Sequence, residues 1–214
     1  MAESVPFDPD CSACPRLAGF LQELKLQYSD YHCRPVAPFG DVEAHLLIVG
    51  LAPGMHGANA SGRPFTGDHA GILLYQTLYD CGLSSAPESL HAQDGLELKD
   101  CRITNAVKCL PPQNKPLGSE IKACNGFLIR ELETLPSDSV VLALGGVAHR
   151  AVVSALGLRQ VDFPFGHGAE HRLNDELVLL DSYHCSRYNT QTRRLTPQMF
   201  QHVFQRARTL LDTG

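Results

Sequence analysis

The sequence predicts an α/β protein with three layers, α/β/α, around a central, mainly parallel four-stranded sheet. Four short apolar runs, rich in Val, Ile and Leu, have the composition of strands that are buried on both faces. Helical patterns separate these runs, which is the order expected of parallel strands joined by helices. The chain has 214 residues, 43% of them hydrophobic, which is enough for a full core. We therefore expect a single domain over residues 1–214.

The expected strands and helices alternate along the chain. The strands are the apolar runs at 45–49, 101–107, 139–144 and 177–180. The helical patterns lie at 71–81, 119–135, 147–155 and 197–211. Ser119 is the expected N-cap of the second helix, and Thr196 followed by Pro197 has the order of a helix start.

Three polar or glycine-rich segments follow predicted strands. They cover residues 50–68, 105–112 and 184–189. Parallel sheets bind ligands beyond the carboxyl ends of their strands, so these segments are expected to meet at one site. In the first segment the glycines let the backbone at Gly50, Ala52 and Gly54 approach a ligand closely.

Charge and composition restrict the possible partners and compartment. The formal net charge is −5, yet residues 182–211 hold five arginines and no acidic residue. This distribution predicts a basic face that attracts a polyanion, or else a solvated C-terminal helix whose charges suit its dipole. No apolar run reaches the length of a membrane span, and the first twenty residues do not resemble a signal peptide. We expect a cytoplasmic protein.

Four of the eight cysteines have a spacing that indicates a metal site. Cys11 and Cys14 form a C-x-x-C pair, and Cys109 and Cys124 lie far along the chain, Cys124 within a predicted helix. Zinc ribbons usually show two such pairs, so the pattern fits an iron–sulfur cluster somewhat better than zinc. The spacing also allows unliganded thiols. The other cysteines, Cys33, Cys81, Cys101 and Cys185, are expected to be free.

Four side chains at the expected site have both a chemical and a structural interpretation. Asn105 can both donate and accept hydrogen bonds at the edge of a ligand, or it can simply end a strand. Phe65 can stack on a planar ligand or belong to the core, and His184 can donate a hydrogen bond to a leaving group or serve the structure. Asp68 precedes a predicted helix and can act as its N-cap, as a catalytic carboxylate, or as both.

The motifs together resemble those of the family 5 (type B) uracil-DNA glycosylases. Residues 50–68, 102–112 and 184–192 are similar to the first, second and third active-site motifs, in that order. Residues 11–17 are similar to the start of the family's cluster-binding segment, here about residues 8–35. The resemblance runs from Cys11 to about Pro197, nearly the whole chain.

The resemblance implies removal of uracil, and of other deaminated bases such as hypoxanthine or xanthine, from double- or single-stranded DNA by a monomer. It implies that Asp68 and His184 are catalytic and that Phe65, Asn105 and the 50–54 backbone bind the base. It also implies a structural [4Fe–4S] cluster on Cys11, Cys14, Cys109 and Cys124. No lysine stands at a motif position that would favour a covalent lyase step.

The third motif departs from the family pattern, which commonly has two prolines in this loop. Here it reads His184-Cys185-Ser186-Arg187-Tyr188-Asn189, so the loop is less stiffened. Tyr188 stands where a wedge side chain enters the duplex. The residues expected to contact DNA are Arg187, Tyr188, Asn189, Arg193 and Arg194.

Two other classes of protein remain as alternatives. One is a nucleic-acid-binding module held together by an iron–sulfur or zinc site, without catalysis. The other is a redox protein that uses the cluster for electron transfer. Release of uracil from DNA separates the enzyme from both.

Overall fold

A computed structural model of the chain describes residues 5–212. Its sheet has six strands in the order β1-β3-β2-β4-β6-β5. The bounds are β1 Phe39–Gly40, β2 Leu46–Gly50, β3 Cys101–Asn105, β4 Ser139–Leu144, β5 Glu170–Arg172 and β6 Leu177–Ser182. The four central strands are parallel, as predicted. The prediction of four strands in total is wrong, because β1 and β5 pair antiparallel at the two edges.

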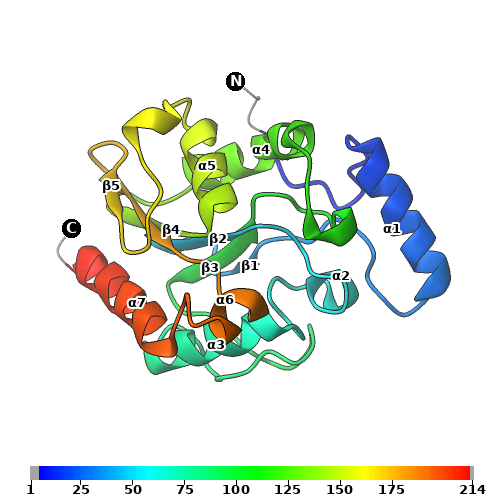
Figure 1. Cartoon of the computed structure of the whole chain (residues 1–214), viewed down its shortest axis with the longest axis horizontal. Helices are drawn as coiled ribbons and strands as arrows, with labels where there is room; N and C mark the ends of the chain where they lie inside the picture. Colours follow the sequence, from blue (N-terminus) through cyan, green and yellow to red (C-terminus); the bar gives the residue numbers. More distant parts are fainter. Residues whose placement is uncertain (1–4, 213–214) are drawn as a thin grey trace.

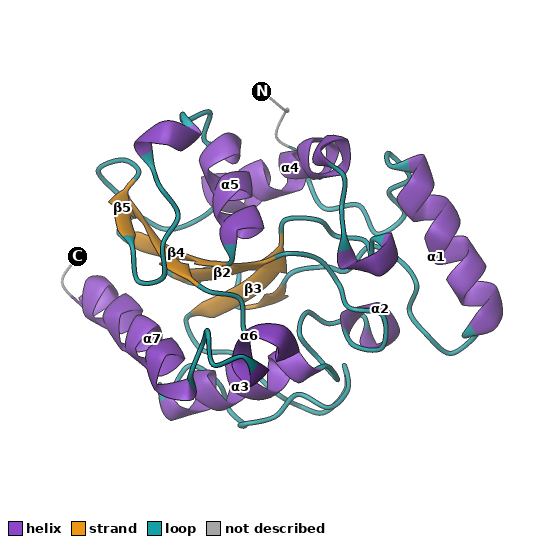
Figure 2. Cartoon of the chain, in the orientation of Figure 1, coloured by secondary structure: helices purple, strands orange, loops and turns teal. Residues whose placement is uncertain are grey.

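Helices cover both faces of the sheet, so the predicted three layers are present. α4 and α5 lie on one face, and α3 and α7 lie on the other (Figure 1). The coloured elements of Figure 2 show the strands enclosed between these two helical layers. The helices are α1 Pro15–Gln27, α2 Ala58–Ser61, α3 His69–Asp80, α4 Gly118–Glu133, α5 Gly146–Ala155, α6 Arg187–Gln191 and α7 Pro197–Asp212.

Strand β2 shows why apolar runs without alternation become central strands. Leu46 and Ile48 pack into the core on the α3 and α7 side of the sheet. Leu47 and Val49, which point the other way, pack with residues of α4 and α5. All four are fully buried, so every position of the strand must be apolar.

Of the two predicted helix caps, Thr196 is confirmed and Ser119 is wrong. Thr196 caps α7, since its Oγ1 accepts the N–H of Met199 at 3.2 Å. Ser119 does not cap α4, which begins at Gly118. There the side chain of Glu120 reaches back and accepts the N–H of Leu117 at 2.7 Å. The carboxylate thus satisfies a backbone N–H at the N-terminus of α4, the role that was expected of the Ser119 side chain.

The N-terminal helix α1 was not predicted. It begins at Pro15, directly after Cys14, and buries Leu17, Leu21 and Leu24. These leucines pack with residues that follow β3, including Val107 and Leu110. α1 therefore holds the first two cysteines beside the segment that carries Cys109. No helix in residues 5–212 has the length and apolar content needed to cross a membrane.

Candidate active site

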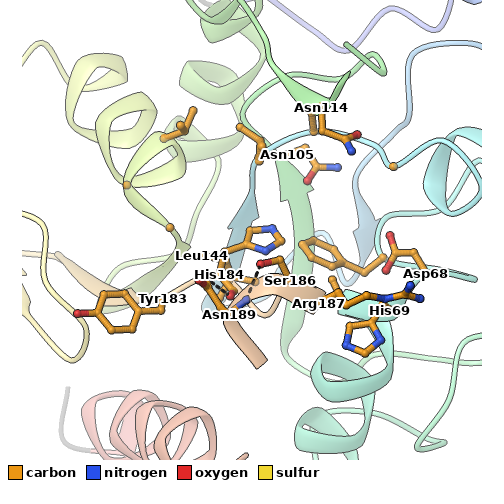
Figure 3. A pocket seen from close by; sticks show the side chains of 18 of the residues that line it. Asp68, His69, Asn105, Asn114, Leu144, Tyr183, His184, Ser186, Arg187 and Asn189 are labelled. Atoms are coloured by element: carbon orange, nitrogen blue, oxygen red, sulfur yellow. Dashed lines mark hydrogen bonds between the residues drawn. The ribbon is translucent and has the colours of Figure 1, made fainter. Parts of the chain in front are cut away.

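A cavity of about 550 Å³ opens beyond the carboxyl ends of the central strands (Figure 3). All three predicted motif segments contribute to its wall. In Figure 3, Asn105, His184 and Asp68 come from different segments and surround the same space. The predicted site residues that line it are Ala52, Gly54, Phe65, Asp68, Asn105, His184, Arg187, Asn189 and Arg194.

Asp68 is the N-cap of α3 and also faces the cavity. Its Oδ1 accepts the N–H of Gly71 at 2.8 Å. Its second oxygen lies against glycine backbone: a Cβ on Gly57 would be 2.6 Å from Oδ2, and one on Gly54 would be 3.4 Å away. Burial raises the pKa of Asp68, while the backbone N–H groups of Gly71 and Ala70 oppose the rise. One oxygen is therefore fixed by the helix, and the other lies against the glycine backbone of the first motif in the cavity wall.

Phe65 is held in an unusual backbone conformation. Its φ is 54°, in the left-handed region that residues other than glycine rarely adopt. A Cβ on Gly71 would lie 1.8 Å from the carbonyl oxygen of Phe65, so the turn requires glycine at position 71. The ring of Phe65 stacks with that of His184, with centroids 6.0 Å apart and planes 29° apart. The backbone thus fixes the ring at one wall of the cavity.

Asn105 presents a hydrogen-bonding group that the protein leaves unused. The residue is 3% exposed, and its Oδ1 has no partner. Buried polar atoms are nearly always paired, so an unpaired acceptor that faces a cavity indicates a ligand donor. Gly50 does not line the cavity but lies behind it. A Cβ there would be 2.4 Å from Asn105 Oδ1 and 2.6 Å from Phe65 Cζ.

His184 stands at the end of β6 with an unpaired ring nitrogen. Its Nδ1 is buried and has no hydrogen-bond partner. Burial lowers the pKa of His184 to about 4, so the ring is neutral near pH 7. The backbone carbonyl of His184 accepts a hydrogen bond from the Asn189 side chain at 2.8 Å. A neutral imidazole here can donate one N–H to a ligand without adding a charge.

Some of the predicted DNA-contacting residues line the cavity, and others lie outside it. Arg187, Asn189 and Arg194 line the cavity, and the guanidinium of Arg194 lies 4.6 Å from the centroid of the Tyr183 ring. Tyr188 lies outside the lining, with 71% of its surface exposed, and Arg193 is exposed as well. Residues 187–191, which were expected in a loop, form the short helix α6.

The sequence analysis missed Asn114, whose side chain lines the cavity. It ends a 3₁₀ turn over Pro112–Asn114, and both Gln113 and Asn114 have positive φ, 56° and 57°. Asparagine tolerates this conformation better than most residues. An asparagine shortly after two consecutive prolines is the signal that could have identified it.

Comparison with known proteins agrees with this geometry. The family profile described as the Uracil DNA glycosylase superfamily matches residues 37–208. A type-5 uracil-DNA glycosylase of Thermus thermophilus is 47% identical over 205 residues, which is 94% of this chain and 93% of the relative. This chain belongs to the type-5 uracil-DNA glycosylase family.

Further relatives agree with this assignment. The type-5 uracil-DNA glycosylase of Pyrobaculum aerophilum is 39% identical, over 92% of this chain and 88% of its own length. A type-4 uracil-DNA glycosylase of Thermotoga maritima is 32% identical over 64% of this chain and 58% of its own length. The type-5 relatives match more of the chain at higher identity, so the family inferred from the motifs is confirmed.

In this type-5 glycosylase chain the four predicted metal ligands line a second cavity, of about 280 Å³. Cys11 and Cys14 come from the segment before α1, Cys109 from the segment after β3, and Cys124 from α4. The backbone N–H of Lys108 donates to the sulfur of Cys124 at 3.3 Å. Burial raises the pKa of Cys109 to about 12 and that of Cys124 to about 11. Binding of a metal must therefore displace protons from these thiols.

A buried polar network braces one wall of the active-site cavity. His149 on α5 contacts Asp181 on β6, with Nδ1 2.8 Å from Oδ1, and its Nε2 lies 2.8 Å from the carbonyl oxygen of Phe163. His171 contacts the carbonyl oxygen of Pro164 at 3.1 Å. These bonds fasten the segment that carries Phe165, a cavity-lining residue, to the strand that leads to His184.

Proposed function

We propose that this protein hydrolyses the N-glycosidic bond between uracil and deoxyribose in DNA and leaves an abasic site. The observation that carries the proposal is the composition of the cavity. An unpaired amide oxygen on Asn105, a neutral His184 and the carboxylate of Asp68 line one space. Each of the three requirements of glycosidic cleavage has a candidate there: base recognition, stabilisation of the leaving base, and stabilisation of a cationic sugar.

Asn105, Phe65 and the loop backbone would recognise the flipped base. The Oδ1 of Asn105 can accept the N3–H of uracil, and its amide N–H groups can donate to a uracil carbonyl. The ring of Phe65 provides a stacking surface next to that edge. The backbone at Ala52 and Gly54 lines the same cavity, and the missing side chain at Gly50 leaves Asn105 and Phe65 in place.

His184 would stabilise the departing base. When the glycosidic bond breaks, the bonding electron pair stays with uracil, and negative charge develops on its O2. A neutral imidazole can donate one hydrogen bond to that oxygen, and its strength rises with the charge. The low pKa of His184 keeps the ring neutral. A neutral ring forms no ion pair with Asp68, so the negative charge of that carboxylate remains available to stabilise the sugar.

Asp68 would stabilise the sugar and orient the water. Loss of the base gives the sugar cationic character at C1′, and a carboxylate nearby lowers the energy of that state. The carboxylate can also hold the attacking water, which adds its oxygen to C1′ and gives a proton to the carboxylate; solvent returns a proton to the uracil anion, so that uracil leaves neutral. No lysine lines the cavity within the described part of the chain. The proposed reaction is therefore simple hydrolysis, without a covalent lyase step.

The exposed residues around α6 would hold the DNA. Arg187, Arg193 and Arg194 would contact phosphates, Asn189 would keep the loop in position, and Tyr188 would enter the gap left by the flipped base. We propose that the protein acts as a monomer in the cytoplasm, on uracil in double- or single-stranded DNA.

The four cysteines would hold a [4Fe–4S] cluster. Four thiols from three segments face one cavity, which fits a thiolate-ligated group. Only one C-x-x-C pair is present, and the other two thiols come from the segment after β3 and from α4, which favours an iron–sulfur cluster over a zinc ribbon with two such pairs. The group would join the N-terminal segment to α4 as a structural support.

The proposed function extends to other deaminated bases. The amide of Asn105 can rotate to present either its donor or its acceptor to a base. It therefore discriminates between bases less strictly than a group whose donors and acceptors are fixed in place. We expect release of hypoxanthine or xanthine, more slowly than uracil, and no release of undamaged cytosine or adenine.

The test is single-turnover incubation with duplexes that carry uracil, hypoxanthine or xanthine, followed by alkaline cleavage of abasic sites. Asp68→Asn protein, purified in the same way, controls for contaminating glycosylases. Binding without any release would favour the non-catalytic nucleic-acid-binding module. Reversible reduction of the bound group, with neither DNA binding nor base release, would favour the redox protein.

A further inference from the structure

Helix α6 is held in place by polar contacts rather than by burial. It has five residues, Arg187–Gln191, and none of them is buried. So short a helix is not stable alone and normally depends on apolar packing. Between the buried flanking residues Cys185 and Leu195, hydrogen bonds therefore contribute to its position and to that of Tyr188.

Two of these hydrogen bonds are local to the third motif. Ser186 caps the helix by accepting the N–H of Asn189 at 3.4 Å. The side chain of Asn189 donates to the carbonyl of His184 at 2.8 Å. Neither bond fixes α6 relative to the first motif.

A third bond joins α6 to the first motif. The Nε2 of His69 lies 3.1 Å from the Oγ1 of Thr190. His69 is the first residue of α3, directly after Asp68, which caps that helix. Thr190 lies two positions after Tyr188 on α6. The bond therefore links the helix end that carries the carboxylate to the helix that carries the wedge.

The partners of Thr190 define the direction of this bond. Its Oγ1 also lies 3.2 Å from the carbonyl oxygen of Ser186 and 3.1 Å from that of Arg187. Carbonyl oxygens only accept, so a hydroxyl proton given to one of them leaves Oγ1 to accept from the Nε2–H tautomer of His69.

We infer that His69 is a positioning residue that fixes the wedge helix α6 relative to the Asp68 carboxylate. The inference rests on the proposed function. In duplex DNA, the wedge must fill the stack while the flipped base sits beside Asp68, so the two elements must keep their spacing. In single-stranded DNA there is no gap to fill, and the spacing has no effect on base flipping.

The test is a double-mutant cycle with His69→Ala and Thr190→Val. Single-turnover rates of uracil release are measured on duplex and single-stranded substrates at saturating protein. Each single variant should lower the duplex rate about fivefold, the effect of one lost hydrogen bond, and should change the single-strand rate less than twofold. The double variant should be no slower than the slower single variant, because both substitutions remove the same bond.

Thr190→Ser provides the matched control, because it keeps the hydroxyl and should retain the wild-type duplex rate. Thr190→Val keeps the imidazole beside Asp68, so its effect cannot arise from loss of that ring. Additive losses, equal slowing on both substrates, or wild-type rates in the single variants would each overturn the inference alone. If the wild-type protein released no uracil from either substrate, the proposed function would fail, and this inference with it.

Discussion

A Cβ atom on Gly50 would lie 2.4 Å from the side-chain oxygen of Asn105, closer than any real contact. It would also lie 2.6 Å from the ring of Phe65. Position 50 therefore has no room for a methyl group unless one of these two proposed base-binding side chains moves.

Gly50→Ala should lower the single-turnover rate of uracil release at least tenfold. It should also reduce the free energy of unfolding by about 1–3 kcal/mol, the usual cost of overpacking. Denaturant unfolding and rate measurements on the same preparation test this. Gly19→Ala, where a Cβ meets nothing within 4 Å, serves as the control and should retain the rate. A wild-type rate in Gly50→Ala would show that Asn105 and Phe65 need not hold their places.

Asp68→Asn should separate the two roles of this residue. Loss of one electrostatic stabiliser should lower the single-turnover rate by roughly a hundredfold or more. Asparagine caps helices about as well as aspartate, so the bond to the N–H of Gly71 can survive and stability should change little. Thermal unfolding and single-turnover excision measure the two effects. A near-normal rate with a large loss of stability would leave Asp68 as a cap alone.

The dependence of the rate on pH should have an acid limb set by Asp68. Burial raises the pKa of this carboxyl above its usual 3.8, so the active carboxylate is lost as pH falls through that raised value. His184 stays neutral until about pH 4. Single-turnover rates from pH 4 to pH 8 should fall on acidification, and the residual rate of Asp68→Asn should lack this limb. An unchanged limb in the variant would assign the titration to another group.

Folding stability should depend on pH through His184. Its pKa falls from the ordinary 6.5 to about 4 in the folded protein, so between these values the unfolded chain binds a proton that the folded chain does not. Stability is therefore lost as pH falls from 6.5 toward 4. His184→Gln should reduce this slope in denaturant unfolding, and an identical slope in the variant would contradict the buried, neutral ring.

Metal content should depend on the cysteines that line the second cavity. Protein purified without oxygen should carry about four irons and about four sulfides per chain. Cys124→Ser should lower iron and soluble yield, whereas Cys81→Ser, which lies outside this cavity, should not. Elemental analysis and sulfide assay measure the contents. Stoichiometric zinc without sulfide in the native protein would refute the cluster.

The exposed side chains near α6 should affect DNA binding in different ways. Neutralising Arg187, Arg193 and Arg194 should weaken DNA binding and flatten its dependence on salt concentration, because fewer phosphates are contacted.

Tyr188→Ala should slow uracil release from duplex DNA more than from single strands, because a wedge acts only in the duplex. Equal slowing on both substrates would remove Tyr188 from the wedge role.

The central strands were predictable because burial on both faces leaves a continuous apolar run. The edge strands were not: β1 has two residues and β5 has three, too few to show a pattern. The start of α4 was misassigned because Glu120, and not Ser119, satisfies the free N–H at its N-terminus. Serine is a favoured N-cap residue, so the local sequence favours Ser119, and only the folded structure shows that the helix begins one residue earlier.

The meeting of the three motifs at one cavity was predictable because each follows the carboxyl end of a predicted parallel strand. Asn114 was missed because its place in the cavity depends on the 3₁₀ turn after Pro111, which has no periodic pattern. Helix α6 was missed because it has no apolar face, so its sequence resembles a loop. The bond between His69 and Thr190 joins residues far apart in the chain, and only the folded structure reveals it.

The left-handed turn at Phe65 has a consequence for protein engineering. Because Gly71 leaves room for the carbonyl of Phe65, the backbone sets the direction in which the side chain leaves position 65. A designer who wants the enzyme to accept a larger base can shorten that side chain, and the replacement will leave the backbone in the same direction. New specificity can instead be built at Asn114, whose side chain also lines the cavity.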